Sequence, residues 1–163
     1  IPEESLVYLA ENCPVPLFCD PVSTTKAEKL RSILAKIHTL KPNKLEAELL
    51  SGVKIETKAD LDAAADKLLG MGVHRLFISL GAEGVYAAMG DERLLLPNLP
   101  GQMVNTTGCG DAFMAAIGWA YLEGMNLKQT ALAGLAAGSI AMESAETINP
   151  SMSATAIKNR MNK

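Results

Sequence analysis

Short apolar runs alternate with amphipathic helical patterns along the first half of this chain. The run PVPLFCDP (14–21) predicts a strand, and TKAEKLRSILAKI (25–37) predicts a helix with one apolar face. IHTLKP (37–42) then predicts a second strand, and NKLEAELLSG (43–52) a second helix that Gly52 ends. Strands joined by helical crossovers run parallel. The alternation therefore restricts the chain to an α/β fold with a largely parallel sheet.

The alternation of helix and strand continues to residue 84, where a hairpin and then a helical region follow. TKADLDAAADKLLGMG (57–72) predicts a helix capped by Thr57, and HRLFISLGAEG (74–84) predicts a buried strand that ends in a glycine turn. In GVYAAMGDERLLLP (84–97) two apolar runs flank a Gly-Asp turn, which predicts an antiparallel hairpin at one edge of the sheet. From residue 108 onward the pattern is helical. We expect one domain for the whole chain.

Charge and cysteine content exclude several classes of protein. The net charge is −3 and the 15 Lys and Arg residues are scattered, so we expect neither a nucleic acid nor a membrane as a partner. The longest uncharged helical stretch, 129–142, is shorter than the roughly 20 residues of a membrane span. Cys13, Cys19 and Cys109 are odd in number and form no CxxC pair, which favours a reducing compartment, the cytoplasm.

The segment NTTGCGDAF (105–113) stands at the start of a helix that carries no charge from residue 112 to 122. We expect protein to surround that helix on nearly every side. The unpaired N–H groups and the dipole at a helix start form a site for an anion. Because Gly108 and Gly110 lack side chains, a phosphate can approach the amides of Gly108, Cys109 and Gly110 closely.

Asp111 lies beside this anion site, the position of a general base for a hydroxyl that attacks a phosphate. On the pattern alone a structural explanation stands beside it: Thr106 or Thr107 caps the helix, and Asp111 complements the helix dipole.

Other chemistries have weaker support. Cys109 stands at a helix start, where a thiol can be activated as a nucleophile, but no motif places His38 or His74 as its base. The two histidines are better explained as structural residues than as metal ligands. The sequence contains no GxxxxGK, which excludes phosphate binding by a P-loop.

NTTGCGDAF resembles the D-T-x-G-A-G-D signature of the ribokinase-like (PfkB) carbohydrate kinase family, whose members transfer the ATP γ-phosphate to a sugar or nucleoside hydroxyl. The resemblance implies a three-layer α/β/α fold with a mostly parallel sheet and an antiparallel hairpin at one edge. It assigns the base to Asp111 and the anion hole to Gly108, Cys109 and Gly110, and it places Thr107 among the nucleotide-binding residues.

The segment departs from the signature at two positions. Cys109 replaces a small Ala, which donation from the backbone tolerates. Asn105 replaces an Asp that in many relatives helps to hold a monovalent cation, so the resemblance leaves potassium as a cofactor of this chain open.

Two further segments resemble family motifs. KPNKLEAELLSG resembles N-x-x-E, which implies that Asn43 and Glu46 act near Mg²⁺ and the ATP phosphates, with Glu46 meeting the metal through water. The same pair fits a capping box, which the sequence alone favours. SLGAEGVY resembles the nucleotide loop T-x-G-x-x-G, which implies that Ser79, Gly81 and Gly84 lie along ATP, although two glycines after a strand also form tight turns. Three motifs in the family order make coincidence a poor explanation.

The segments around IHTLKPN and LEAELLSG resemble most the family members that phosphorylate the ribose 5′-hydroxyl of pseudouridine. A ribokinase- or fructokinase-like sugar kinase and a non-catalytic nucleotide-binding module are the alternatives. The chain starts at Ile1 and lacks the Gly-Gly motif and β lid of the family's sugar-binding half. We therefore expect residues 1–163 to be the C-terminal, nucleotide-binding and catalytic part, with little activity alone. A homodimer through that lid is a further expectation.

Overall fold

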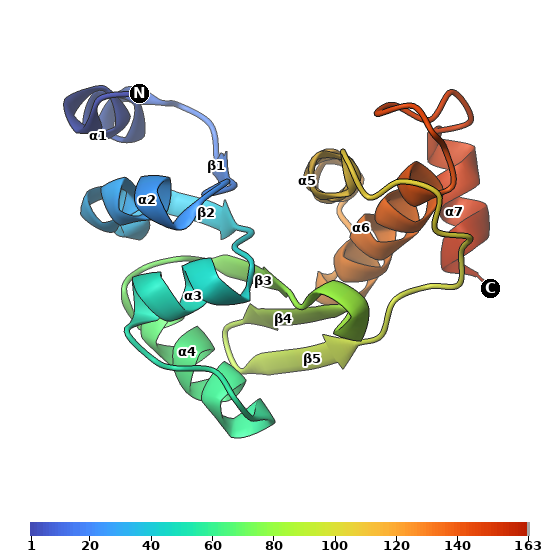
Figure 1. Ribbon diagram of the computed structural model, residues 1–163. Helices are drawn as coiled ribbons and strands as arrows, with labels where there is room; N and C mark the ends of the chain where they lie inside the picture. Colours follow the sequence, from blue (N-terminus) through green and yellow to red (C-terminus); the bar gives the residue numbers. More distant parts are fainter. Residues whose placement is uncertain (163) are drawn as a thin grey trace. The chain divides into compact units, whose positions relative to one another are not determined.

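The computed structural model describes residues 1–162, which divide into two compact units (Figure 1). Unit 1 comprises Ile1–Gly81 and Tyr86–Leu95, and unit 2 comprises Ala82–Val85 and the described residues from Leu96 onward. An apolar cluster lies within each unit. The single-domain organisation stays a prediction.

A five-stranded sheet lies in unit 1, apart from Val85 and Leu96, and its strands are adjacent in chain order. The strands are β1 (Leu17–Cys19), β2 (Ile37–Leu40), β3 (Arg75–Ser79), β4 (Val85–Met89) and β5 (Glu92–Leu96). β2 pairs in parallel with β1 and with β3. Only Gly90 and Asp91 connect β4 to its neighbour β5, and so short a turn permits antiparallel pairing alone. The expected hairpin at one edge of a mostly parallel sheet is confirmed.

The helices of unit 1 are α1 (Glu3–Asn12), α2 (Thr24–Ala27), α3 (Lys44–Ser51) and α4 (Lys58–Gly70), with the 3₁₀ segments η1 (Glu28–Lys36) and η2 (Gly81–Glu83). The single helix expected after β1 is therefore an α-helical turn that continues as a 3₁₀ helix. Thr57 caps α4 and Gly52 ends α3 in the left-handed conformation, with φ of +69°, as the sequence predicts.

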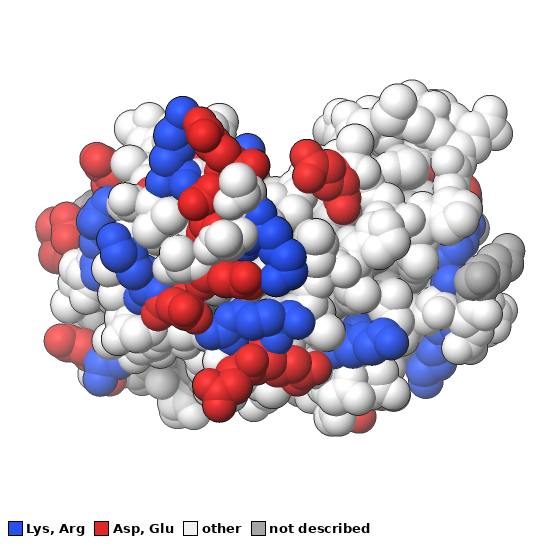
Figure 2. Space-filling view, turned by 90° about the horizontal axis from the view of Figure 1, so that it is seen from below, with Lys and Arg blue, Asp and Glu red and all other residues white. Residues whose placement is uncertain are grey.

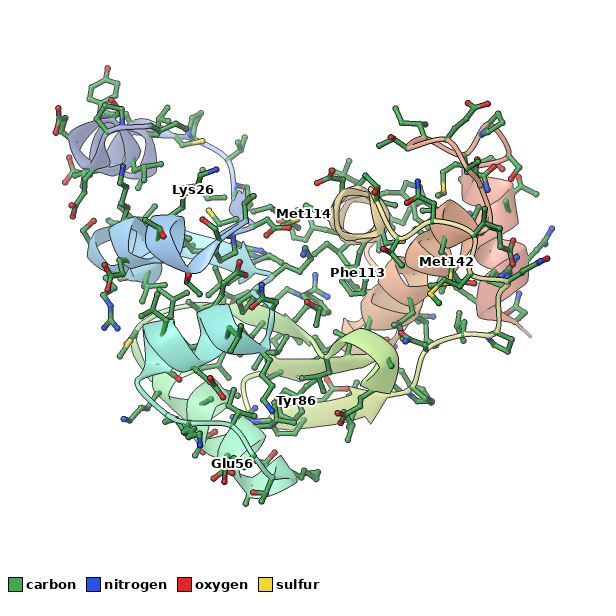
Figure 3. The ribbon with its side chains drawn as sticks, viewed as in Figure 1. Lys26, Glu56, Tyr86, Phe113, Met114 and Met142 are labelled. Atoms are coloured by element: carbon green, nitrogen blue, oxygen red, sulfur yellow. The ribbon has the colours of Figure 1, made fainter. Side chains whose placement is uncertain are left out.

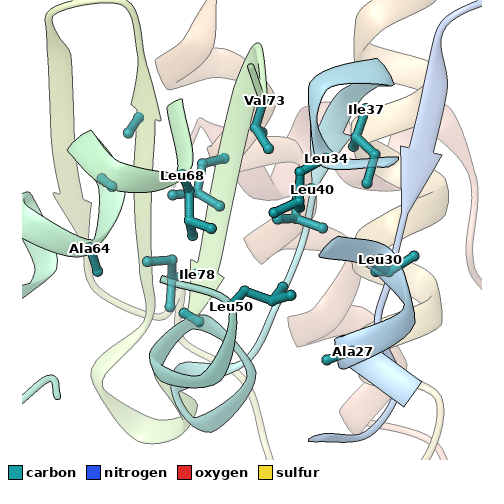
Figure 4. Close-up of a cluster of buried hydrophobic side chains, with 14 of the residues drawn as sticks. Ala27, Leu30, Leu34, Ile37, Leu40, Leu50, Ala64, Leu68, Val73 and Ile78 are labelled. Carbon is teal, nitrogen blue, oxygen red and sulfur yellow. The ribbon is translucent and has the colours of Figure 1, made fainter. Parts of the chain in front are cut away.

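These helices bury an apolar core against the sheet (Figure 4). Leu34 of η1, Leu50 of α3 and Leu68 of α4 are at most 3% exposed and share one cluster with Leu40 and Ile78 of the sheet. Each such side chain contributes about 1.5–3 kcal/mol to the free energy of unfolding. The core therefore fixes the ends of β2 and β3, where residues of the candidate site follow.

Unit 2 is built from α5 (Cys109–Leu122), α6 (Leu127–Met142) and α7 (Ala154–Met161). Small side chains let α5 and α6 approach closely, because Ala116, Ala120, Ala133 and Ala137 are all at most 2% exposed. At one contact, a Cβ on Gly134 would lie 2.6 Å from the ring of Phe113, which Figure 3 labels on α5.

The expectation that α5 is enclosed on nearly every side is wrong. Its buried residues, Phe113, Ala116, Ile117 and Ala120, recur at helical spacing along one stripe. Leu122 is 83% exposed, and Ala115 is exposed as well. An uncharged helix therefore need not be buried on every face, since only one stripe of α5 packs against α6.

Surface charges are mixed in sign. On the face that Figure 2 shows, Lys and Arg side chains lie interspersed with Asp and Glu. Among the ion pairs of unit 1, Lys58 Nζ lies 3.0 Å from Asp62 Oδ2 on α4. None of the helices in residues 1–162 has both the length and the apolar content that crossing a membrane requires.

Candidate active site

The start of α5 forms the first group of candidate residues. Gly108 is the N-cap, with φ of +84°, and no side chain caps this helix. The explanation in which Thr106 or Thr107 caps α5 is therefore wrong. A Cβ at position 108 would lie 2.6 Å from the carbonyl oxygen of Thr147, so both the conformation and the space require glycine.

The first turn of α5 offers backbone donors. The Cys109 N–H donates to the Thr106 carbonyl at 3.3 Å, and the Ala112 N–H makes the first intrahelical bond, to Gly108 at 2.9 Å. Within residues 1–162, no backbone carbonyl accepts from the N–H of Gly110 or Asp111. The N–H groups of Gly110 and Asp111 are therefore available to an anion, and the assignment of the anion hole to Gly108, Cys109 and Gly110 stays a prediction.

Asp111 lies in this first turn, and its side chain is exposed rather than packed into protein. A carboxylate beside unpaired helix-start amides can take a proton from an attacking hydroxyl while the amides hold the phosphate. The base assignment requires this exposure and stays a prediction.

Cys109 is a poor nucleophile. Burial raises the pKa of its thiol, and a backbone hydrogen bond to the sulfur offsets this only in part. The side chain is therefore the neutral thiol at neutral pH, and thiolate chemistry loses support. A small, uncharged side chain here is consistent with a role through the backbone alone.

The second group lies in unit 1, where Asn43 begins α3. Asn43 Oδ1 accepts from the Glu46 N–H at 2.9 Å, and Glu46 Oε2 accepts from the Asn43 N–H at 2.8 Å. This reciprocal pair is a capping box, so the structural explanation of the N-x-x-E segment is confirmed. It does not exclude a second role.

Glu46 differs from a simple capping residue in its surroundings. It is 1% exposed, and its second oxygen, Oε1, has no hydrogen-bond partner within residues 1–162. By contrast Asp60, in the capping box of α4, is only half-buried, and hydrogen bonds from Glu56 and Thr57 lower its pKa. Because an unpaired buried carboxylate oxygen is costly, Glu46 Oε1 fits a position that faces a bound cation or its water.

No group of three or more His, Cys, Asp or Glu side chains in residues 1–162 is arranged to hold a metal ion. One carboxylate is nevertheless enough for Mg²⁺, which keeps several waters and takes its other ligands from substrate phosphates. The donor set around Glu46 therefore fits magnesium bound together with a nucleotide.

The end of β3 lies beside Asn43. Ser79 and Asn43 form a parallel bridge, and the Ser79 N–H donates to the Pro42 carbonyl at 2.9 Å. Gly81 follows with φ of +61° and is exposed, and a Cβ at this position would meet no atom within 4 Å. Unit 1 thus brings Asn43, Glu46 and Ser79 together.

Gly84 has a structural explanation of its own. Its φ is +100°, and a Cβ would lie 2.0 Å from the carbonyl oxygen of Leu96. The chain therefore needs glycine here to pass the end of the hairpin. This agrees with the explanation in which the glycine forms a tight turn. A role of Gly84 along ATP stays a prediction, as does that of Gly81.

Sequence reasoning missed an ion pair at the carboxyl ends of β1 and β2. Lys41 Nζ lies 2.7 Å from Asp20 Oδ2, and the side chains are 7% and 23% exposed. Asp20 also accepts the N–H of Val22 at 3.1 Å, where Val22 has an unusual φ of +66°. The signal was available, since both charged residues directly follow apolar strands, at the sheet edge where ligands of α/β proteins bind.

The two histidines lie together on the sheet. The His38 ring stacks on Phe18 with 5.5 Å between centroids and lies 4.8 Å from the His74 ring. Burial lowers the pKa of His38, and the nearby His74 and Arg75 lower it further. A neutral ring packed among aromatic neighbours agrees with a structural role.

Comparisons with known proteins place these features in context. Residues 4–154 match the pfkB family carbohydrate kinase. The chain is 37% identical over 156 residues to the pseudouridine kinase of Escherichia coli K12, an alignment that covers 94% of this chain and 50% of that protein.

Solved structures of kinases are also similar to this chain. A Clostridium perfringens protein described as a sugar kinase superposes with a TM-score of 0.93 at 30% identity, over 99% of this chain and 52% of its own. The Arabidopsis thaliana ribokinase complexed with ribose and ATP gives 0.83 at 26%, over 100% and 54%. The chain thus spans about half the length of these proteins, and the expected ribokinase-like fold is confirmed.

Proposed function

Because this chain belongs to the pfkB family of carbohydrate kinases, which are phosphotransferases acting on sugar or nucleoside hydroxyls, we propose that the complete protein phosphorylates pseudouridine at its ribose 5′-hydroxyl with ATP. The observation that carries the proposal is the first turn of α5. There an exposed carboxylate, Asp111, adjoins unpaired amides at a position where only glycine fits.

In the proposed reaction, the acceptor hydroxyl oxygen attacks the γ-phosphorus of ATP in line with the leaving ADP. A bond forms between that oxygen and phosphorus, and the bond from phosphorus to the β–γ bridging oxygen breaks. The hydroxyl proton passes to the carboxylate of Asp111. The amides of Gly108, Cys109, Gly110 and Asp111 stabilise the negative charge on the transferred group.

The residues of unit 1 are proposed to act on the nucleotide. Asn43 and Glu46 would hold the magnesium ion, Glu46 through water, and the ion when bound neutralises charge on the phosphates. Ser79 and Gly81, with Gly84 and Thr107 of unit 2, are proposed to contact ATP. Lys41 is the cation that Asp20 orients at the same sheet edge.

The charge of Glu46 can be tested separately from its capping role. In Glu46→Gln a side-chain oxygen still accepts from the Asn43 N–H, so we expect the free energy of unfolding to change by less than about 1 kcal/mol. Loss of the charge is expected to raise the Mg²⁺ concentration for half-maximal turnover about 10- to 100-fold. Urea unfolding and magnesium titration of the complete protein measure the two effects.

Asp60→Asn is the matched control, because it also replaces a carboxylate with a carboxamide in a capping box, that of α4, where the acidic residue is only half-buried. It should leave the magnesium requirement unchanged, while loss of the charge that accepts the hydrogen bonds from Glu56 and Thr57 lowers the free energy of unfolding. An unchanged magnesium requirement in Glu46→Gln would show that Glu46 only caps α3 and does not act on the metal.

The substrate is tested by comparing pseudouridine, uridine, ribose and fructose as acceptors, with ADP release as the measurement. We expect kcat/KM for pseudouridine to exceed that for uridine by at least about tenfold, since a site built around the extra N–H of pseudouridine leaves groups unpaired with uridine. A preference for ribose or fructose would instead establish a sugar kinase. ATP binding without turnover on any acceptor would instead support the alternative, a non-catalytic nucleotide-binding module.

The homodimer and the cytoplasmic location stay predictions. The three cysteines are free thiols, which agrees with a reducing compartment.

A further inference from the structure

Asn105 connects two loops of unit 2. Its Oδ1 accepts the N–H of Thr107 at 2.9 Å, and its Nδ2 donates to the carbonyl of Ala145 at 3.3 Å. A backbone N–H can pair only with the amide oxygen, and a carbonyl only with the NH₂ group. The two partners therefore fix the orientation of the carboxamide.

The loop that contains Asn105 leads directly into the first turn of α5. The N–H groups of Val104 and Asn105 both donate to the carbonyl of Met142, at 2.8 and 3.1 Å, and Figure 3 labels Met142. A Cβ on Gly108 would meet the carbonyl of Thr147 at 2.6 Å. Residues 104–108 thus lie against residues 142–147, and the Asn105 side chain links the two segments.

A monovalent cation does not fit beside this side chain. Such ions bind carboxylate and carbonyl oxygens, and the family signature has Asp at this position. Here the atom that faces the Ala145 carbonyl is Nδ2, whose hydrogens carry positive charge, repel a cation and take one of the two acceptor positions of that oxygen. The amide hydrogen supplies the positive charge between the two loops that a cation would otherwise supply.

We propose that Asn105 is a positioning residue whose carboxamide replaces a monovalent cation as the link between these loops, so that phosphoryl transfer by this protein needs no potassium. For its catalytic part the proposal rests on the proposed kinase function. Its structural part, the cation-free link itself, can be measured without turnover.

The test is Asn105→Asp in the complete protein. The new carboxylate would face the Ala145 carbonyl, two acceptors in contact, unless a cation enters between them. We expect wild-type turnover and Tm to be equal, within about twofold and about 1 °C, in KCl and in choline chloride at one ionic strength. The variant should lose about tenfold in turnover in choline chloride and regain it in KCl, with Tm about 3 °C higher in KCl.

Asn126→Asp is the matched control, because Asn126 caps α6 and Asp caps equally well. It should show no specific response to potassium. Potassium stimulation of the wild-type protein would overturn the proposal even if Asn105→Asp failed to fold, and so would a folded Asn105→Asp whose Tm ignores potassium. If the wild-type protein phosphorylates no acceptor, the kinase proposal fails. The comparison of Tm in KCl and in choline chloride still tests the cation-free link through Asn105.

Discussion

Replacing Asp111 with Asn in the complete protein is expected to lower kcat for phosphoryl transfer about 10²- to 10⁴-fold. Asn has nearly the same shape but cannot take the proton of the acceptor hydroxyl. The Kd for ATP should stay within about threefold, because removal of a negative charge near the phosphates does not weaken their binding. Single-turnover kinetics and calorimetric titration with ATP measure the two quantities.

A role of Asp111 in the helix dipole alone predicts a different result. In that case Asp111→Asn would lower the free energy of unfolding by about 0.3–1 kcal/mol and leave kcat intact. Asp91→Asn is the control for a change of charge, since Asp91 is exposed in the hairpin turn. Turnover of Asp111→Asn equal to that of Asp91→Asn would remove the assignment of the base.

The second large effect is expected from Gly108→Ala. Alanine at φ of +84° is strained, and its Cβ would lie 2.6 Å from the Thr147 carbonyl. The chain must shift to relieve this contact, and the amides of the first turn of α5 shift with it. Loss of one aligned donor typically lowers kcat by about 10²- to 10³-fold, so we expect a decrease in this range together with a loss of more than about 1 kcal/mol in stability.

Gly124→Ala separates the strain from the displacement. Gly124 follows the other end of α5 with φ of +69°, and no atom lies within 4 Å of its Cβ position. This control should lose stability through the unfavourable φ and keep kcat. Equal kcat values for the two variants would show that the amides of the α5 turn do not act on the phosphoryl group.

The parts of the fold that the sequence predicted depend on neighbouring residues. The Asn43 and Thr57 caps and the Gly52 helix end are made by groups within a few residues of one another, so the local pattern specifies them. The hairpin turn is local too. The order of helices and strands could also be predicted, because the spacing of apolar residues within each segment indicates whether that segment is a helix or a strand.

The errors arose where the sequence pattern is compatible with more than one arrangement. An uncharged helix was taken as enclosed, whereas α5 buries one stripe. Two threonines before α5 suggested a side-chain cap, whereas the left-handed Gly108 holds that position without one. In both cases contacts with α6 and with Thr147, which lie far along the chain, decided the outcome.

The sequence by itself determined the α/β class, the strand order along the chain, and the motif that places a carboxylate at a glycine-rich helix start. Only the tertiary structure decided that Lys41 pairs with Asp20, that Glu46 Oε1 is buried without a partner, and that Asn105 reaches Ala145. The physical reason is distance along the chain. Hydrogen bonds within a turn are specified by adjacent side chains, whereas burial and pairing of remote charges depend on how the strands and helices pack.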